Sequence, residues 1–250
     1  MNMHRFLKLF LVYFVSAIPN QAVRAAESPP LPSIQSQVKE MEKKSAAEKK
    51  PSPFSKQELA IMKQSTKELA KAMPSPGLKP GQTAPDFELS NAFGQKIRLS
   101  EQLKKGPVIL SFYRGAWCPF CSIQLNALHQ SIPYFKKYDA QLILVTPQKP
   151  DHSLAQIEKA KYEFEILSDL DSEVMKQYKL FFKLSPALVK VYLKHDLDIE
   201  SFNGKDRAVL PVPGTFVIDK KGIIRAAFAD TDYKKRMEPT AIVEALKKLK

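Results

Sequence analysis

Short apolar runs bounded by turn residues set the pattern of the chain from residue 77 onward. Residues 108–113 form a run between a Gly-Pro pair and a glycine, which is typical of a strand buried on both faces. Residues 142–145 form a second such run after a helical stretch, so we predict a right-handed β-α-β unit with parallel strands. We expect residues 164–167 to form a strand at the edge of the same sheet.

Helices and hairpins complete this part of the chain. A helix is predicted from Pro119, with inward apolar positions at three- and four-residue spacing and a kink at Pro133. Pro239 opens a last amphipathic helix. The other expected elements are hairpins at 87–89/97–99 and 215–218/223–228, short helices at 154–161 and 172–178, and an insertion at 179–210 that contains a helix. This order predicts an α/β fold, a three-layer sandwich with a mixed central β-sheet and an N-terminal β-hairpin.

The N-terminus has a different pattern. An apolar run over residues 6–18 follows His4 and Arg5, and small residues follow it up to Ala25. The run is shorter than the about 20 residues that a membrane-spanning helix needs. We therefore interpret residues 1–26 as a secretory signal peptide, with an uncleaved membrane anchor as the alternative. Either interpretation places the folded part outside the cytoplasm, as an exported periplasmic or secreted protein.

Two further segments precede the main domain. Residues 27–54 are polar and rich in proline and lysine, which predicts a mobile linker. Ser55 and Glu58 then have the spacing of a capping box, so we expect a helix over residues 55–74 that ends at Pro74. A narrow apolar seam along this helix indicates a packing surface. We favour docking of the helix on the domain, and a homodimer contact is the alternative.

Composition and charge narrow the class of protein. With 250 residues and 44% hydrophobic residues, the chain is long enough for one domain with a real core, over residues 77–250. The net charge of +13 is spread over single lysines and short pairs. This distribution favours solubility and contact with an anionic membrane surface. Nucleic-acid binding is not expected, because no nucleic-acid-binding motif accompanies the charge.

The chain has two cysteines, Cys118 and Cys121. A structural disulfide between them would close almost no loop and would stabilise little. A zinc site would need a second ligand pair, and the four histidines are scattered along the sequence. We therefore interpret the two cysteines as a redox-active pair. We expect no metal and, because no nucleotide or flavin motif is present, no bound cofactor.

The predicted elements around the pair favour thiol chemistry. Cys118 and Cys121 follow a buried strand and open a helix, where free backbone N–H groups and the helix dipole stabilise a thiolate. Pro119 is tolerated in a first helical turn, where its missing N–H would lack a partner. Arg114 adds a positive charge if its side chain turns back toward the pair, and is solvated otherwise. Trp117 is interpreted either as part of the site or as core packing.

Three segments carry a resemblance to a known family. Residues 108–125, with the sequence VILSFYRGAWCPFCSIQL, are similar to the W-C-x-x-C active site of thioredoxin-like proteins. Residues 81–87 (GQTAPDF) resemble the opening of peroxiredoxins of the AhpC/TSA family, and residues 210–219 (LPVPGTFVID) resemble the cis-proline strand of thioredoxin-like proteins. The resemblance covers residues 77–250. It implies a thioredoxin-like fold with an insertion before that strand, a cis Val212–Pro213 bond facing the cysteine pair, and peroxide chemistry.

The chain departs from the peroxiredoxin pattern at three positions. Cys121 falls on the peroxidatic cysteine, but Arg114 stands in place of a proline, Cys118 in place of a threonine or serine, and Pro213 in place of an arginine. A thiol peroxidase would use Cys121 as the nucleophile and an external, thioredoxin-like dithiol as the reductant. A thiol-disulfide oxidoreductase would instead attack a protein disulfide with Cys118 and resolve the mixed disulfide with Cys121. We favour the peroxidase, and the third alternative is a redox-inactive binding protein on the same fold.

Overall fold

The computed structural model describes residues 30–48 and 52–249, so the predicted signal peptide lies outside the described residues. Within these residues, seven strands form one mixed sheet in the order β2-β1-β5-β4-β3-β8-β9, and β6 and β7 form a separate two-stranded sheet. The strands are β1 (Glu88–Asn91), β2 (Lys96–Arg98), β3 (Val108–Phe112), β4 (Gln141–Thr146), β5 (Glu165–Ser168), β6 (Phe181–Lys183), β7 (Val209–Pro211), β8 (Gly214–Ile218) and β9 (Ile224–Ala229).

Helices of very different length connect and flank these strands. They are α1 (Ile34–Ala47), α2 (Lys56–Ala72), α3 (Leu99–Lys105), α4 (Pro119–Gln130), α5 (Ile132–Lys136), α6 (Pro150–Ala160), α7 (Glu173–Gln177), α8 (Pro186–Lys194), α9 (Ile199–Asn203) and α10 (Pro239–Lys247). The kink expected at Pro133 is a break between two helices, because Pro133 lies in the first turn of α5. Within the described ranges, no helix combines the length and the apolar character needed to cross a membrane.

The buried strand β3 lies at the centre of the sheet. It pairs in parallel with β4 and antiparallel with β8. Helices α4 and α5 connect β3 to β4, so the predicted β-α-β unit with parallel strands is confirmed. A strand with partners at both edges and helices over both faces has no solvent-facing side, which explains why its sequence is apolar except for Ser111.

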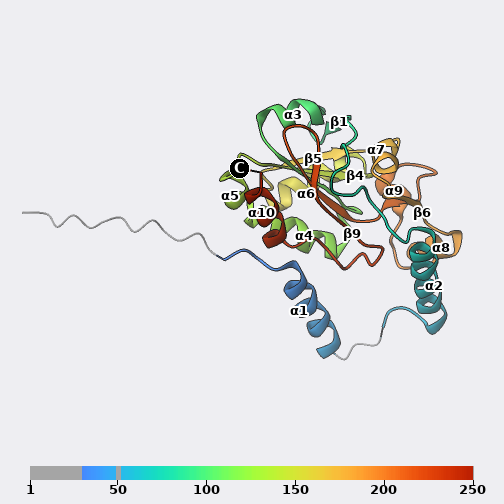
Figure 1. Ribbon diagram of the computed structural model, residues 1–250. Helices are drawn as coiled ribbons and strands as arrows, with labels where there is room; N and C mark the ends of the chain where they lie inside the picture. The colour runs from blue at the N-terminus through green and yellow to red at the C-terminus, as the bar shows by residue number, and fades with distance from the viewer. Residues whose placement is uncertain (1–29, 49–51, 250) are drawn as a thin grey trace, which may run out of the picture.

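Alternate residues of β3 supply the cores on the two faces of the sheet. Leu110 and Phe112 belong to a cluster that includes residues of α3 and α7. Ile109 belongs to a second cluster with residues of α4, α5 and α10. Helices thus cover both faces of the mixed sheet (Figure 1), and the predicted three-layer α/β sandwich is confirmed.

The N-terminal hairpin corrects the prediction for residues 164–167. Strand β5 is not at the edge, because it pairs with β4 on one side and with β1 of the hairpin on the other. Asn91 fixes this arrangement, since its side-chain amide donates to the Glu165 carboxylate of β5 at 2.9 Å. The Asn91 Oδ1 atom also accepts hydrogen bonds from the backbone N–H groups of Phe93 and Gln95 in the turn. One side chain therefore holds both the turn and its neighbouring strand.

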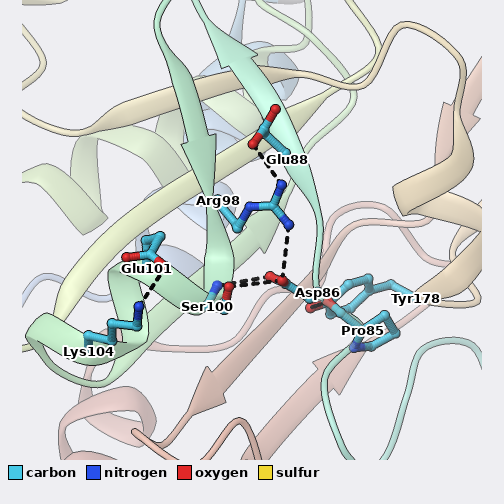
Figure 2. A network of polar contacts seen from close by, with 8 residues as sticks. All are labelled: Pro85, Asp86, Glu88, Arg98, Ser100, Glu101, Lys104 and Tyr178. Carbon is cyan, nitrogen blue, oxygen red and sulfur yellow. Dashed lines mark hydrogen bonds and ion pairs between the residues drawn. The ribbon is translucent and has the colours of Figure 1, made fainter.

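Asp86 joins the start of the domain to α3 (Figure 2). Its carboxylate accepts hydrogen bonds from the backbone N–H and the hydroxyl of Ser100, each at 2.9 Å, and lies 3.7 Å from the Arg98 guanidinium. The hydroxyl of Tyr178 donates to the carbonyl oxygen of Pro85 at 3.0 Å. The Pro85–Asp86 pair of the peroxiredoxin-like opening segment therefore fastens the hairpin, α3 and the end of α7 together.

The segment predicted as a mobile linker contains helix α1, so that prediction was wrong. The polar composition hides two apolar positions that the helix buries. Ile34 and Val38 are each 1% exposed and pack on Ala127 of α4. The side chain of Ser33 caps the N-terminus, and the Glu238 carboxylate accepts a hydrogen bond from the Ile34 N–H at 2.9 Å. These contacts place α1 beside α4 (Figure 1).

Helix α2 begins at the capping box that the sequence predicts. The Ser55 hydroxyl accepts from the Glu58 N–H at 3.3 Å, and the Glu58 carboxylate accepts from the Ser55 N–H at 2.7 Å. The same carboxylate forms a 2.7 Å ion pair with Lys194 of α8. The apolar seam of α2 contacts the main core through Leu69 and Met73. The helix is therefore docked on the domain, alongside α8 (Figure 1).

The insertion predicted at residues 179–210 forms a small lobe of β6, α8, α9 and β7. Its core consists of Leu184, Leu188, Ile199 and Leu210. Antiparallel pairing of β6 with β7 closes the lobe and returns the chain to the central sheet at β8. The lobe therefore stands next to the strand that pairs with β3.

Candidate active site

The two cysteines lie at the N-terminus of α4. Cys118 is the N-cap residue, Pro119 opens the helix, and Cys121 lies in its first turn. The backbone N–H of Cys121 donates to the Cys118 carbonyl oxygen at 3.0 Å. Both thiols are free, with Cys118 1% exposed and Cys121 fully buried. The site is thus a buried dithiol at a helix N-terminus, where backbone N–H groups favour negative charge.

Two buried arginines act on this pair. The Arg236 Nη2 atom lies 3.6 Å from the Cys121 Sγ atom, and Arg114, in the loop after β3, supplies a second positive charge. Burial alone would raise the pKa of Cys121, but the hydrogen bond from Cys118 and the charges of the two arginines lower it below the usual value. The pKa of Cys118 is raised, by its hydrogen bond with Cys121 and by burial. The charge of Arg236, in contact with the Cys121 sulfur, therefore favours a thiolate at Cys121.

Aromatic side chains hold Arg114 in place. The guanidinium carbon lies 4.8 Å from the ring centroid of Trp117 and 4.6 Å from that of Tyr233. The Nη2 atom donates to the Tyr192 hydroxyl at 3.1 Å. The buried Nε atom has no hydrogen-bond partner in the part of the chain that the structure describes. Arg114 and Trp117 thus lie together near the cysteines, and the Nε–H donor of Arg114 is unpartnered within the described residues.

The loop between β3 and α4 depends on a glycine and a glutamine. Gly115 has a φ of +149°, and a Cβ at this position would lie 2.5 Å from the Trp117 Nε1 atom. The Gln148 Oε1 atom accepts from the backbone N–H of Ala116 at 2.9 Å, and its amide nitrogen donates to the Tyr113 hydroxyl at 3.2 Å. These contacts fix the path of the loop that leads into the cysteine pair.

A groove of about 510 Å³ opens beside the site, between α2, α8 and the segment that joins β7 to β8. The apolar side chains in its walls include Met62, Leu69, Met73, Phe181, Phe182 and Leu188. Arg114, whose charge acts on both cysteines, also lines the groove, together with Pro213 and Tyr233. A ligand in the groove would therefore reach the guanidinium that lies next to the thiols.

The Val212–Pro213 bond corrects one implication of the resemblance. No peptide bond within the described ranges is cis, so this bond is trans. The flanking pairings explain the difference. The Val212 N–H donates to the Leu180 carbonyl oxygen at 2.7 Å, and Gly214 pairs with Phe112 of β3. An extended chain therefore runs from β7 directly into β8, and Pro213 lies in the wall of the groove.

Sequence reasoning missed four residues of the site: Gln124, Tyr192, Tyr233 and Arg236. Gln124 left a signal, because it is a polar residue at an inward helix position three residues after Cys121. Arg236 also left one, since most basic residues of this chain are lysines and an arginine in a loop is therefore unusual. The two tyrosines lie in the insertion and in the loop after β9, where spacing gave no sign of their position.

The fold and the cysteine pair define a thioredoxin-like protein equipped for thiol redox chemistry. The chain belongs to the AhpC/TSA family, which matches residues 80–227. The solved structure of peroxidoxin BcpB from Mycobacterium tuberculosis has the same fold, with a TM-score of 0.55 and 21% identity over 69% of this chain and 99% of that chain.

Two kinds of relative are similar to this chain in sequence. Peroxiredoxin Bcp of Escherichia coli is 30% identical over 101 residues, which are 40% of this chain and 64% of that protein. The thiol-disulfide oxidoreductase ResA of Geobacillus kaustophilus is 28% identical over 159 residues, which are 63% of this chain and 74% of that protein. The chain thus spans just under two thirds of the length of the Bcp relative and about three quarters of the ResA relative.

Proposed function

We propose that the protein is a thiol-dependent peroxidase in which Cys121 is the nucleophile and Cys118 is the resolving cysteine. The observation that carries this proposal is the 3.6 Å contact between the Arg236 Nη2 atom and the Cys121 Sγ atom, which places a positive charge beside that sulfur and holds the pKa of Cys121 below its usual value. Thiolate is the nucleophilic form of cysteine, so Cys121 is the sulfur prepared to attack. The family register, in which Cys121 falls on the peroxidatic cysteine, supports the same assignment, and the similarity to peroxiredoxin Bcp supports peroxide as the substrate.

The reaction begins when the Cys121 thiolate attacks one oxygen of a hydroperoxide. An S–O bond forms, the O–O bond breaks, and the leaving alkoxide or hydroxide takes the proton of Cys118. The Cys118 thiolate then attacks the sulfenic sulfur of Cys121, an S–S bond forms and the S–O bond breaks, and the expelled hydroxide is neutralised by the proton that Cys121 released to solvent when it ionised. The cysteines lose two electrons and the peroxide gains two. An external dithiol becomes oxidised as it returns the pair to the dithiol form.

The fluorescence of Trp117, the one tryptophan of the chain, tests this proposal because Trp117 adjoins Cys118. Reduced protein is mixed with near-stoichiometric hydrogen peroxide in a stopped-flow instrument. We expect a fast fluorescence change that Cys121→Ser abolishes. Cys118→Ser should still react once and accumulate a sulfenic acid that dimedone traps. A fast reaction in Cys121→Ser, with none in Cys118→Ser, would overturn the assignment of the nucleophile.

A second candidate function is that of a thiol-disulfide oxidoreductase acting on exported proteins. The apolar groove beside Arg114 and Pro213 favours this function, because an extended polypeptide could bind along its apolar walls. The similarity to ResA favours it as well. Here Cys118 would form a mixed disulfide with the substrate and Cys121 would release it. A rapid response to a scrambled disulfide protein, with a sluggish response to peroxide, would favour this function. If the Cys118→Ser, Cys121→Ser double variant complements a deletion strain, the protein is instead a redox-inactive binding protein.

Export of the domain is a further part of the proposal, and it rests on the N-terminal pattern alone. Purification of the protein from the periplasmic fraction or the medium, followed by mass spectrometry, should give an N-terminus near Ala26. An intact N-terminus in the membrane fraction would favour the uncleaved anchor. Sedimentation with and without anionic vesicles tests a homodimer and the membrane-surface association that the net charge of +13 favours.

A further inference from the structure

Arg236 is a buried cation whose charge meets no carboxylate. Its side chain comes from the loop before α10 and is 7% exposed. None of the ion pairs among residues 30–48 and 52–249 includes it. The Cys121 sulfur, 3.6 Å from Nη2, is the group in contact with Arg236 that can become an anion. A buried charge without a counter-ion is costly, so the folded protein is stabilised when Cys121 ionises.

The guanidinium is also fixed in direction. The Nε atom donates to the Gln124 Oε1 atom at 2.8 Å. The Nη1 atom donates to the carbonyl oxygen of Lys235 at 2.9 Å and to that of Tyr233. Neutral acceptors on three sides thus leave Nη2 pointing at the sulfur without cancelling the charge.

Gln124 owes its own orientation to two hydroxyl groups. Its amide nitrogen donates to the Ser111 Oγ atom at 3.1 Å and to the Thr215 Oγ1 atom at 3.3 Å. These hydroxyls bond each other at 2.9 Å, because Ser111 of β3 and Thr215 of β8 are paired across the sheet. With the amide nitrogen held by the hydroxyls, the amide oxygen must face Arg236. The buried hydroxyls of Ser111 in β3 and Thr215 in β8 are thereby satisfied.

We propose that Arg236 activates the Cys121 thiolate in place of the strand arginine that Pro213 replaces, and that Gln124, anchored on Ser111 and Thr215, is the residue that positions Arg236. This inference rests on the proposed function insofar as Cys121 is the attacking sulfur. Gln124 is a positioning residue, because it contacts Arg236 and lies one helical turn from Cys121 without touching a reacting atom in this arrangement. A relay of hydrogen bonds, from Ser111 and Thr215 through Gln124 to Arg236, thus holds the guanidinium beside the sulfur in a fixed position relative to the central strands.

The test measures the ionisation of Cys121 directly, in a Cys118→Ser background with one thiol. Thiolate ultraviolet absorbance and alkylation rate are followed against pH in Arg236→Met, Gln124→Met and Gln124→Glu. We expect each to raise the pKa of Cys121, with about a tenfold lower alkylation rate for Arg236→Met at pH values below the pKa of the single-thiol parent, since one pKa unit is a tenfold change in thiolate in that pH range. Gln124→Glu keeps an acceptor for Arg236 but adds a negative charge, so it should raise the pKa although the guanidinium stays in place. Gln130→Met, at an exposed position of α4, and Arg225→Met, at a surface ion pair, are the controls.

The outcomes separate the inference from the proposed function. A Cys121 pKa in folded Arg236→Met or Gln124→Met equal to that of the controls would overturn the inference. If Gln124→Met does not fold, two other measurements replace it: the Cys121 pKa in Gln124→Glu, and the alkylation rate of Arg236→Ala with added guanidinium ion. An unchanged pKa in the first, together with no recovery of the rate in the second, would overturn the inference. Raised pKa values in a protein that does not react with peroxide would support the relay and refute the peroxidase.

Discussion

The carboxylate of Glu238 accepts a hydrogen bond from the backbone N–H of Ile34 at 2.9 Å, across 204 residues of sequence. It also accepts from the Gln35 N–H at 2.8 Å, so one side chain binds two free donors at the start of α1. Glu238 follows Arg236 by two residues. Lys234, on the other side of Arg236, forms a 2.6 Å ion pair with Glu42 of α1. Helix α1 therefore packs on α4 and is tied to the loop that carries the arginine of the site.

Replacing Glu238 should release the start of α1. Glu238→Ala removes the acceptor of two helix N–H groups, and loss of a capping acceptor costs about 1 kcal/mol. We expect faster hydrogen exchange in residues 34–38, with little change in the central strands. Glu244→Ala, at an exposed ion pair on α10, is the matched control. Equal exchange of α1 in both variants would show that the apolar contacts of Ile34 and Val38 hold the helix without Glu238.

Asp169 should make stability depend on pH. Burial raises its pKa to about 6, against hydrogen bonds from the N–H groups of Met175 and Val174 that lower it. Because the folded value lies above the unfolded value of about 3.9, the folded state binds the proton more tightly, and this contribution is lost as pH rises through 6. Asp169→Asn should therefore increase the free energy of unfolding at pH 8, relative to wild type, by about 1–2 kcal/mol. Urea unfolding at pH 5 and pH 8 measures this difference.

A neighbouring carboxylate gives the control for that experiment. The pKa of Asp171 is lowered, by the hydrogen bond from the Glu173 N–H against the effect of burial. Its contribution is present above the unfolded pKa and is lost as pH falls through the folded value, so Asp171→Asn should not improve stability at pH 8. A gain at pH 8 in both variants would mean that net charge, and not the burial of Asp169, sets the pH dependence.

The sequence predicts the central sheet well because a strand buried on both faces needs apolar residues at nearly every position. Residues 108–113 are apolar except for Ser111, and this pattern admits few other structures. The position of β5 is harder, since its neighbour in the sheet, β1, lies far away in sequence and is joined to it by Asn91. Helix α1 is harder still, because two buried apolar residues in a polar segment do not outweigh its composition. Both errors arise from long-range contacts that local patterns do not encode.

The candidate site shows the same division. Cys118 and Cys121 follow from spacing and from the strand-to-helix turn, which are local properties. Arg236 lies 115 residues after Cys121, and only the packing of α10 and its preceding loop brings the two together. The hydrogen bond from the Val212 N–H to the Leu180 carbonyl oxygen is likewise a contact with the insertion that the motif does not encode.

Arg114 should promote ionisation of Cys121, and the pH dependence of the reaction rate distinguishes this effect from a loss of packing. Arg114→Ala removes one of the two charges that lower the pKa of Cys121 to about 5, so the rate of reaction with hydrogen peroxide should fall about tenfold at pH values below that pKa, for each unit by which the pKa rises. The loss should shrink as pH rises, because Cys121 then ionises without help. Stopped-flow rates across the pH range check this, with Arg98→Ala at a surface ion pair as the control. A loss that is constant with pH would mean that Arg114 acts on the peroxide or on packing instead.

The groove should matter more for large substrates than for small ones. Leu69 of α2 lines it, and Leu69→Asp would place a charge in an apolar wall. We expect kcat/KM for a bulky apolar hydroperoxide, such as cumene hydroperoxide, to fall about tenfold relative to that for hydrogen peroxide, since a change in apolar contact of this size alters discrimination by about 1–3 kcal/mol. Leu59→Asp is the matched control, because Leu59 lies on the same helix, is 44% exposed and is outside the groove. An unchanged ratio of the two substrates in Leu69→Asp would mean that the peroxide reaches Cys121 by another route, since a substrate whose apolar part occupies the groove must respond to a charge in its wall.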